Sequence, residues 1–264
     1  MKLTQFAHLS KLLCAPQAPP PHPPIPHRAS FSLSAAERMA QYVETAFALD
    51  SAGRLLEVND GLHSIAPRAF IAATAEGSVV YARHDLPEET FNQLHETAAN
   101  EPRWSDLKAG GLQIDAYRRA VAESGAPVLR LETGPFYWFP ALRRDPARTT
   151  AVPTAENVTL SSGLAAWADA LRHWRPVGVA LEGGQAIAIC ASVRRSKSAC
   201  VAGCETDVAF RGRGHGGEAV TRWVAAVQAT ERLAFYNTEW SNAASQRLAA
   251  RAGAEPFGEG VHLF

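Results

Sequence analysis

The chain carries no excess charge, since 26 lysines and arginines balance 26 aspartates and glutamates among its 264 residues. A neutral chain presents no broad field that would attract a polyanion, so we expect no nucleic-acid partner. Long apolar runs are also absent. The longest apolar-rich stretch, Ala186–Val193, falls far short of the roughly 20 residues that a membrane-spanning helix needs. Only four cysteines are present, and a chain of this length buries a sizeable core without disulfides.

The N-terminal segment has the composition of neither a secretory signal nor a folded element. Gln5, His8 and Lys11 interrupt its apolar residues, so we expect neither export nor lipidation, and a cytoplasmic location with reduced cysteines. Seven of the eleven residues from Pro16 to Pro26 are proline, which excludes a helix or a central strand. We predict a disordered tail over residues 1–29.

Residues 30–149 have an α+β pattern and no chemical motif that we recognise. Ser34 and Glu37 have the spacing of a capping box at a helix start. The sequence then predicts two hairpins, two helices, a strand, and an aromatic loop or edge strand. In that order these are 46–49 with 54–58, 69–73 with 78–82, 87–100, 114–124, 128–131 and 134–140.

A polar linker around Pro146 and Pro153 leads into residues 150–264, in which helices and strands alternate. We expect helices over 163–174, 216–229 and 242–252, and strands over 177–181, 186–193, 199–208, 233–238 and 261–264.

The most informative segment is a glycine-rich loop at 211–217, RGRGHGG, between a predicted strand and a predicted helix. Glycines at a helix entrance let an anion approach the free backbone N–H groups at the positive end of the helix dipole. The loop therefore predicts a pyrophosphate site, with a glycine turn that binds nothing as the alternative. It lacks the glycine spacing of a dinucleotide fold and the G-K-[ST] of a triphosphate P-loop. The amphipathic helix that follows distinguishes it from low-complexity RNA-binding segments.

Read as R-x-x-G-x-G over 211–216, the loop resembles the R/Q-x-x-G-x-G/A signature of the GNAT acyltransferase superfamily. The N-x-x-S at 242–245 follows a predicted strand and is similar to a helix start found in that superfamily. The last predicted helix ends in Ala-Gly-Ala at 252–254, where relatives often have a Gly-Phe pair. The resemblance covers about residues 150–264.

The resemblance implies an α/β fold with a mixed, mostly antiparallel sheet flanked by helices, and residues 30–149 as an α+β region beside it. The strand ending at Val208 and the strand at 233–238 would diverge, and the pantetheine arm of an acyl-CoA would lie between them. The expected acyl-CoA contacts are Val208, Phe210, Arg211, Gly212, Arg213, Gly214, His215, Gly216, Gly217, Asn242 and Ser245.

Direct transfer to an amine needs a proton acceptor near the end of the first of these strands. Glu205 and Asp207 are the candidates, because alternation places both on one face of a strand; a solvated or paired carboxylate is the alternative. Many GNAT enzymes carry a tyrosine on the last helix as acid for the leaving thiolate, and that position is Ala249 here. Tyr236, Ser245 or water would replace it, or the thiolate would leave unassisted.

Two further groups have both a functional and a purely structural explanation. Cys200 and Cys204 lie four residues apart on a predicted strand, about 13 Å, which is too far for a disulfide or for one zinc ion. We therefore expect no metal site. The aromatic run Phe136–Phe139 either lines an acceptor pocket or packs in the core.

Together these features predict an N-acetyltransferase that uses acetyl-CoA as co-substrate and a small-molecule or peptide amine as acceptor, with no metal. The alternative is a non-catalytic module that binds or senses acyl-CoA, which the alanine at position 249 favours. A third possibility is an interaction protein that binds its partners through the proline-rich tail.

Overall fold

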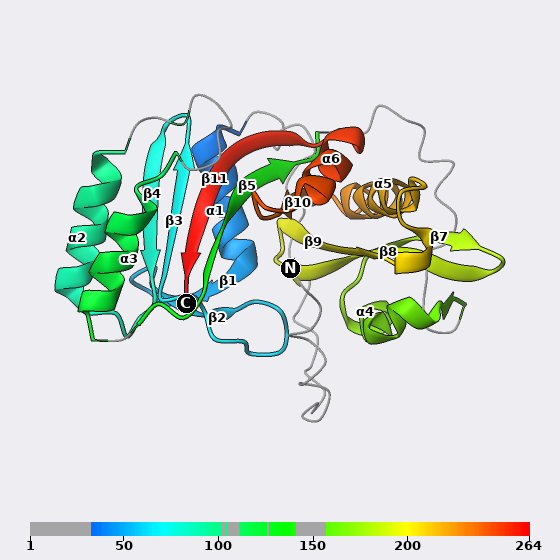
Figure 1. Ribbon diagram of the computed structural model, residues 1–264, viewed down its shortest axis with the longest axis horizontal. Coiled ribbons are helices and arrows are strands. Elements are labelled where there is room, and N and C mark those ends of the chain that lie inside the picture. Colours follow the sequence, from blue (N-terminus) through cyan, green and yellow to red (C-terminus); the bar gives the residue numbers. More distant parts are fainter. Residues whose placement is uncertain (1–32, 102–103, 105–110, 126, 141–156) are drawn as a thin grey trace.

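The computed structural model describes residues 33–101, 104, 111–125, 127–140 and 157–264 (Figure 1). The tail predicted over residues 1–29 and the linker around Pro146 and Pro153 lie outside these ranges. Within them, no helix has both the length and the apolar character that crossing a membrane requires.

Nine of the described strands form one open, mixed, mostly antiparallel sheet. Its order is β4-β3-β11-β5-β10-β9-β8-β6, and β7 pairs with β8 outside this path. The strands are β3 Ala69–Thr74, β4 Gly77–Ala82, β5 Leu131–Trp138, β6 Thr159–Leu160, β7 Val177–Glu182, β8 Gln185–Arg195, β9 Ala199–Thr206, β10 Leu233–Asn237 and β11 Glu255–Leu263. A separate antiparallel hairpin joins β1 Phe47–Leu49 to β2 Leu55–Val58.

Helices cover both faces of this sheet, so its residues alternate between two cores. On one face α1 packs over Phe70 and Phe136, and η4 and α4 pack over Ile189. On the other face α2 and α3 pack over Ile71, and α5 and α6 pack over Tyr137. The helices are α1 Ala35–Ala46, α2 Glu88–Ala99, α3 Ile114–Glu123, the 3₁₀ helix η4 Ser162–Trp167, α4 Ala170–His173, α5 His215–Gln228 and α6 Ala243–Arg251. The α/β fold expected from the resemblance, a mixed sheet between helices, is confirmed.

Local signals in the first half predicted most elements correctly. The capping box is present: Ser34 N–H donates to Glu37 Oε2 at 2.7 Å, and Glu37 N–H donates to Ser34 Oγ at 3.2 Å. Both hairpins and both helices, α2 and α3, form within a residue or two of the predicted ranges.

The aromatic segment at 134–140 is a central strand, so the prediction of a loop or edge strand is wrong. It belongs to β5, which lies between β11 and β10. Phe136 and Trp138 pack toward α1, whereas Tyr137 and Phe139 pack toward α5. A strand buried on both faces loses the alternation of polar and apolar residues that identifies a half-buried strand. The strand predicted at 128–131 begins only at Leu131.

Three predictions in the second half were also inaccurate. The helix predicted over 163–174 is divided into η4 and α4. The strand predicted to reach Val208 ends at Thr206, because Asp207 caps a short 3₁₀ turn, η5 (Val208–Phe210). The last strand begins at Glu255, six residues before the predicted start at Val261.

The sheet joins the two halves of the sequence. β11, drawn red in Figure 1, lies between β3 and β5 and pairs antiparallel with both. Strands from residues 69–138 and from residues 159–263 therefore share one hydrogen-bonded layer.

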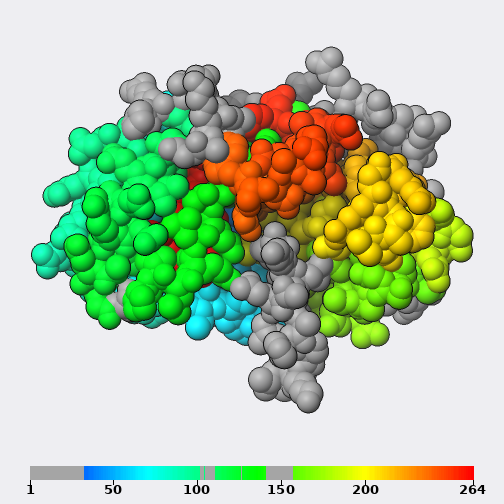
Figure 2. Space-filling view, viewed as in Figure 1, coloured from blue at the N-terminus to red at the C-terminus, as the bar shows by residue number. Residues whose placement is uncertain are grey.

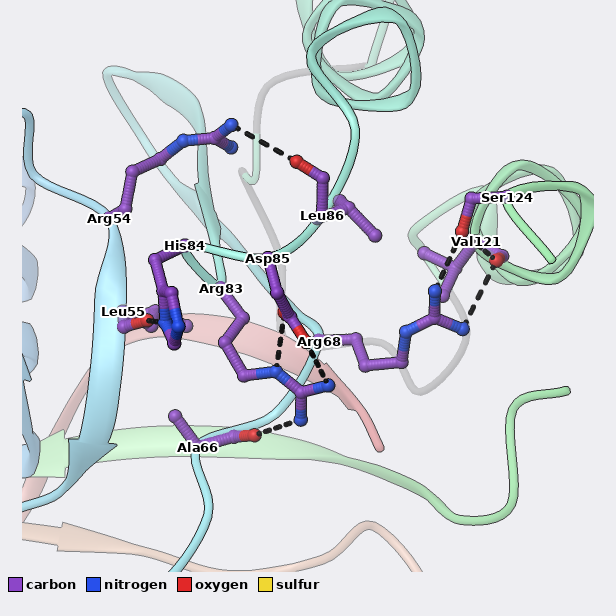
Figure 3. A network of polar contacts seen from close by, with 10 residues as sticks. All are labelled: Arg54, Leu55, Ala66, Arg68, Arg83, His84, Asp85, Leu86, Val121 and Ser124. Atoms are coloured by element: carbon purple, nitrogen blue, oxygen red, sulfur yellow. Dashed lines mark hydrogen bonds and ion pairs between the residues drawn. The ribbon is translucent and has the colours of Figure 1, made fainter. Parts of the chain in front are cut away.

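Arginines attach the first half's connections to this layer (Figure 3). Arg68 donates to Ser124 Oγ at 2.7 Å, just after α3. Arg83, after β4, donates to the Ala66 carbonyl at 3.1 Å and pairs with Asp85 at 2.7 Å. These contacts connect the segments next to β3, β4 and α3 at the edge of the sheet farthest from the glycine-rich loop.

Candidate functional site

Strands β9 and β10 begin side by side and then diverge. Their parallel pairing extends over three residue pairs, from Leu233 opposite Ala199 to Phe235 opposite Val201. Beyond this, β9 continues to Thr206 with no described strand paired to it on that side, while β10 stays paired with β5. The edge of β9 over residues 202–206 therefore faces a gap in the sheet.

A cavity of about 740 Å³ lies at this gap, within the size range of small-molecule sites. The lining toward α5 and α6 includes Cys204, Thr206, Gly216, Tyr236, Ser245 and Leu248. The lining toward α1 and η4 includes Glu132, Phe136, Trp167, Arg194, Gly203, Glu205 and His262. The cavity thus reaches both faces of the sheet. Figure 2 shows the segment containing the glycine-rich loop (yellow) and the segment containing α6 (orange) exposed on the same side of the molecule.

The glycine-rich loop brings the start of α5 to the cavity. Gly214 is the N-cap with φ +92°, and the first helical hydrogen bond runs from Glu218 N–H to its carbonyl at 3.2 Å. The N–H groups of residues 215–217 precede that bond and have no partner within the helix. A Cβ at Gly216 would meet Leu248 Cδ1 at 2.7 Å and Thr206 Oγ1 at 2.9 Å, whereas a Cβ at Gly217 would meet nothing within 4 Å. Gly216 is needed for packing, and Gly217 leaves open space.

Most of the residues predicted to contact acyl-CoA line this cavity. These are Phe210, Arg211, Gly212, Gly214, His215, Gly216, Gly217, Asn242 and Ser245. Val208 and Arg213 do not line it: Val208 is 72% exposed, and the Arg213 guanidinium lies 5.7 Å from the centre of the Phe210 ring. His215 Nε2 is 3.5 Å from Glu182 Oε2.

Asp207 is a buried residue that caps the exposed turn η5, and it does not line the cavity. Its carboxylate accepts hydrogen bonds from Ser161 Oγ at 2.6 Å, Ala209 N–H at 3.0 Å and Gly163 N–H at 3.2 Å. These bonds, that of Ser161 first, hold the pKa of the carboxyl below its usual value. The strand ends one residue earlier, so the alternation that placed Asp207 on the same face as Glu205 does not apply.

Glu205 lines the cavity on the α1 face of β9. Its Oε1 accepts from Arg211 Nη2 at 2.7 Å, and Arg211 Nε also donates to the Thr206 carbonyl at 3.1 Å. The glutamate side chain remains 23% exposed. Glu205 is therefore a paired carboxylate that is still accessible from the cavity.

Two hydroxyl groups meet at the opposite wall. Tyr236 OH and Ser245 Oγ are 2.7 Å apart. Burial raises the pKa of the tyrosine, which keeps the phenol protonated. Asn242 Oδ1 accepts from Ser245 N–H at 3.0 Å, which fixes the start of α6. Ala249 is buried in the core beside α5 and presents no polar group.

The polar cavity residues that the sequence analysis missed include Glu132, Arg194 and His262. They come from β5, β8 and β11, so no local motif joins them. The only feature that these three residues share in the sequence is that each is titratable and lies near one end of a strand. His262 is 9% exposed, and burial, with the nearby Arg194 and Arg130, lowers its pKa to about 3, so the imidazole is neutral.

The described cysteines are free thiols, and Cys190 lies opposite Cys204 across β8 and β9. Among the described residues, no group of three or more histidines, cysteines, aspartates or glutamates is arranged to hold a metal ion.

No family model matches the chain, and neither does any curated protein. Solved structures to which this chain is similar include a GNAT-family protein from Novosphingobium aromaticivorans, with 18% sequence identity and a TM-score of 0.37. The alignment covers 52% of this chain and 65% of that protein. A GNAT-family acetyltransferase from Colwellia psychrerythraea has 13% identity and TM-score 0.41, covering 74% and 80%. A GCN5-related N-acetyltransferase-like protein from Streptococcus suis has 12% identity and TM-score 0.42, covering 75% and 85%.

Structural similarities at these sequence identities and TM-scores do not support a conclusion about the activity of the chain. The GNAT-like description of the fold depends on the chain's own topology: parallel strands β9 and β10, joined through α5, separate after three residue pairs.

Proposed function

We propose that the protein is an acyl-CoA-dependent N-acyltransferase that transfers an acetyl group from acetyl-CoA directly to an amine. One observation carries the proposal: β9 loses its partner after Val201 where the glycine-rich start of α5 borders a 740 Å³ cavity. The open edge of β9 suits the amide groups of a pantetheine arm, which would bind as an added strand. The N–H groups of residues 215–217 suit a pyrophosphate. Because acyl-CoA is an intracellular substrate, we expect a cytoplasmic location.

Proton transfer from the amine is the role we propose for Glu205. The neutral amine attacks the thioester carbonyl carbon, a C–N bond forms, and the C–S bond breaks as the tetrahedral intermediate collapses. Glu205, directly or through a water molecule, receives the proton that the amine loses. Arg211 Nη2 donates a hydrogen bond to the Glu205 carboxylate at 2.7 Å, and this bond fixes the glutamate side chain at the cavity.

The leaving thiolate has a proton donor in Tyr236. Its hydroxyl lines the cavity and is hydrogen-bonded to Ser245 at 2.7 Å, so Ser245 can donate a hydrogen bond to the tyrosine oxygen as the proton leaves. This pair replaces the last-helix tyrosine whose position is Ala249. A thiol with a pKa near 8.5 needs only modest assistance to leave.

The test is CoA binding by calorimetry together with thiol release from acetyl-CoA in the presence of a panel of primary amines. We expect binding, and amine-dependent release of free CoA with formation of the N-acetyl product. Tight CoA binding without turnover on any amine would favour the alternative, a non-catalytic acyl-CoA-binding module. Absence of CoA binding by the folded protein would exclude both.

A further inference from the structure

The face of the cavity opposite α5 and α6 contains an arginine that forms no ion pair with any residue of the described ranges. Arg194, on β8, lines the cavity, and its buried Nε makes no hydrogen bond. No carboxylate among the described residues forms an ion pair with its guanidinium. Arg194 is partly buried, and a cation without a counter-ion in a cavity wall favours the binding of an anion there.

Strand register places Arg194 on the same face as the proposed proton acceptor. Arg194 is opposite Val201, whose side chain packs toward α1. Glu205 lies four residues beyond Val201 on β9, so it projects from the same face. Arg194 and Glu205 therefore line the same side of the cavity, and a ligand bound by Arg194 would extend along the strands toward Glu205 and contact it directly or through a water molecule.

The remaining charges here already have partners. Glu205 is paired with Arg211 at 2.7 Å, and Glu132 lies 3.4 Å from Arg130. His262 is neutral. Arg194 is thus the cationic group of this face that a ligand can neutralise, and the planar fork of a guanidinium matches the two oxygens of a carboxylate.

We infer that the acceptor is an amine that also carries a carboxylate, an amino acid or a similar compound, and that Arg194 binds this carboxylate while the amine faces Glu205. Phe136, Trp167 and Val193, which line the same cavity, provide an apolar wall for the rest of the molecule. The inference rests on the proposed function for the identity of the reaction, but the carboxylate site itself does not require turnover.

The test therefore uses binding of a product-like ligand as well as catalysis. N-acetyl-leucine and N-acetyl-leucinamide differ in the carboxylate alone, and each is titrated into the full-length protein in the presence of CoA. We expect the acid to bind about 10- to 100-fold more tightly than the amide, as a charge-assisted hydrogen-bonded pair predicts. In the transfer assay, leucine should have a lower KM than isoamylamine by a similar factor.

Arg194→Gln should remove the preference for the acid in both measurements and leave the amide and isoamylamine unchanged. Arg194→Lys should restore part of it, since it keeps the charge and loses the fork. The matched control is Arg195→Gln, because Arg195 is adjacent in sequence, donates to the Arg175 carbonyl at 3.2 Å and does not line the cavity.

Equal binding of acid and amide by the wild type, or an equal loss of both in Arg194→Gln, overturns the inference. If acyl transfer still occurs and does not depend on the carboxylate of the acceptor, the proposed function stands. Conversely, carboxylate binding through Arg194 without any acyl transfer would support the site and refute the proposed function.

Discussion

Glu205 and Asp207 are separated by one residue and have opposite environments. Glu205 projects into the cavity with one arginine partner, whereas Asp207 is 6% exposed and satisfied by three donors. We therefore propose a chemical role for Glu205 and a structural role for Asp207 at the corner between β9 and η5. Exchanging each for its amide separates these roles.

Glu205→Gln should lower kcat roughly 10²- to 10⁴-fold, the usual contribution of a general base, with unchanged CoA affinity. The acidic limb of the pH–rate profile should flatten, since the titrating group is gone. Steady-state kinetics from acidic to alkaline pH provide the measurement. Asp207→Asn is the control: it should lower the melting temperature and leave the shape of the profile unchanged. A Glu205→Gln enzyme with a normal acidic limb would place the base elsewhere.

Glu259 gives a second prediction, for stability rather than rate. This β11 residue is 3% exposed, and burial raises its pKa to about 7 from 4.5. The folded state then binds the proton more tightly than the unfolded state, so the free energy of unfolding falls as pH rises from about 4.5 to 7. Glu259→Gln, which cannot ionise, should be more stable than wild type by about 2–3 kcal/mol at pH 8 and equal to it near pH 4. Urea denaturation at the two pH values measures the free energy of unfolding of both proteins. The same difference between them at both pH values would contradict the prediction.

Single-residue roles were predicted only where a short motif carries them. The glycine-rich loop and the N-x-x-S start are local, so their positions at the cavity followed from the sequence. Arg194 and His262 reach the same cavity from strands 68 residues apart in number, and only the sheet brings them together. Asp207 was misplaced because its Ser161 and Gly163 partners are distant in sequence.

At the scale of elements, the glycines at the start of α5 differ in what a side chain at each position would meet. Gly214 needs its positive φ and Gly216 touches Leu248 and Thr206, so substitutions there disturb the fold as well as the site. Gly217 has ordinary helical geometry and free space above it. It is therefore the position at which binding can be tested without unfolding.

Gly217→Val should abolish or strongly weaken CoA binding in a well-folded protein, because the added methyl groups occupy the space next to the free N–H groups. Gly217→Ala should have a smaller effect. Ala225→Val is the control, since it introduces the same β-branched side chain into α5 away from the cavity. Calorimetric titration with CoA decides the result. Wild-type affinity in Gly217→Val would refute this placement of the pyrophosphate.

Element prediction succeeded for most helices and strands, including β3, which is buried along its whole length, but it failed for the aromatic strand β5. The Val220, Trp223 and Val227 stripe identified α5 correctly. The sequence of β5 is a continuous aromatic run because α1 and α5 cover its two faces. The sequence alone does not show that helices cover both faces.

At the scale of the whole molecule, the sheet crosses the boundary near residue 150 that composition and motifs suggested. Both partners of β11, β3 and β5, belong to the first half of the sequence. The domain boundary near residue 150 remains a prediction. Because the sheet crosses it, we do not expect the second half of the sequence to fold by itself.

A fragment of residues 150–264 should lack a cooperative unfolding transition, since β11 and β10 would each expose an unpaired edge and half of the apolar core would be open. Mixing it with a fragment of residues 1–149 should restore the transition and CoA binding. Circular dichroism and calorimetry on the separate and mixed fragments make the comparison. A stable 150–264 fragment that binds CoA would contradict this view.

The position of β11 also constrains how the protein is made. During synthesis β3 and β5 leave the ribosome long before β11, and the strand that joins them is the last of the sheet to be translated. Until then each has an unsatisfied edge that another nascent chain can join. Production of the protein therefore depends on protecting these edges during translation, and slow elongation through residues 139–254 would lengthen the period of exposure.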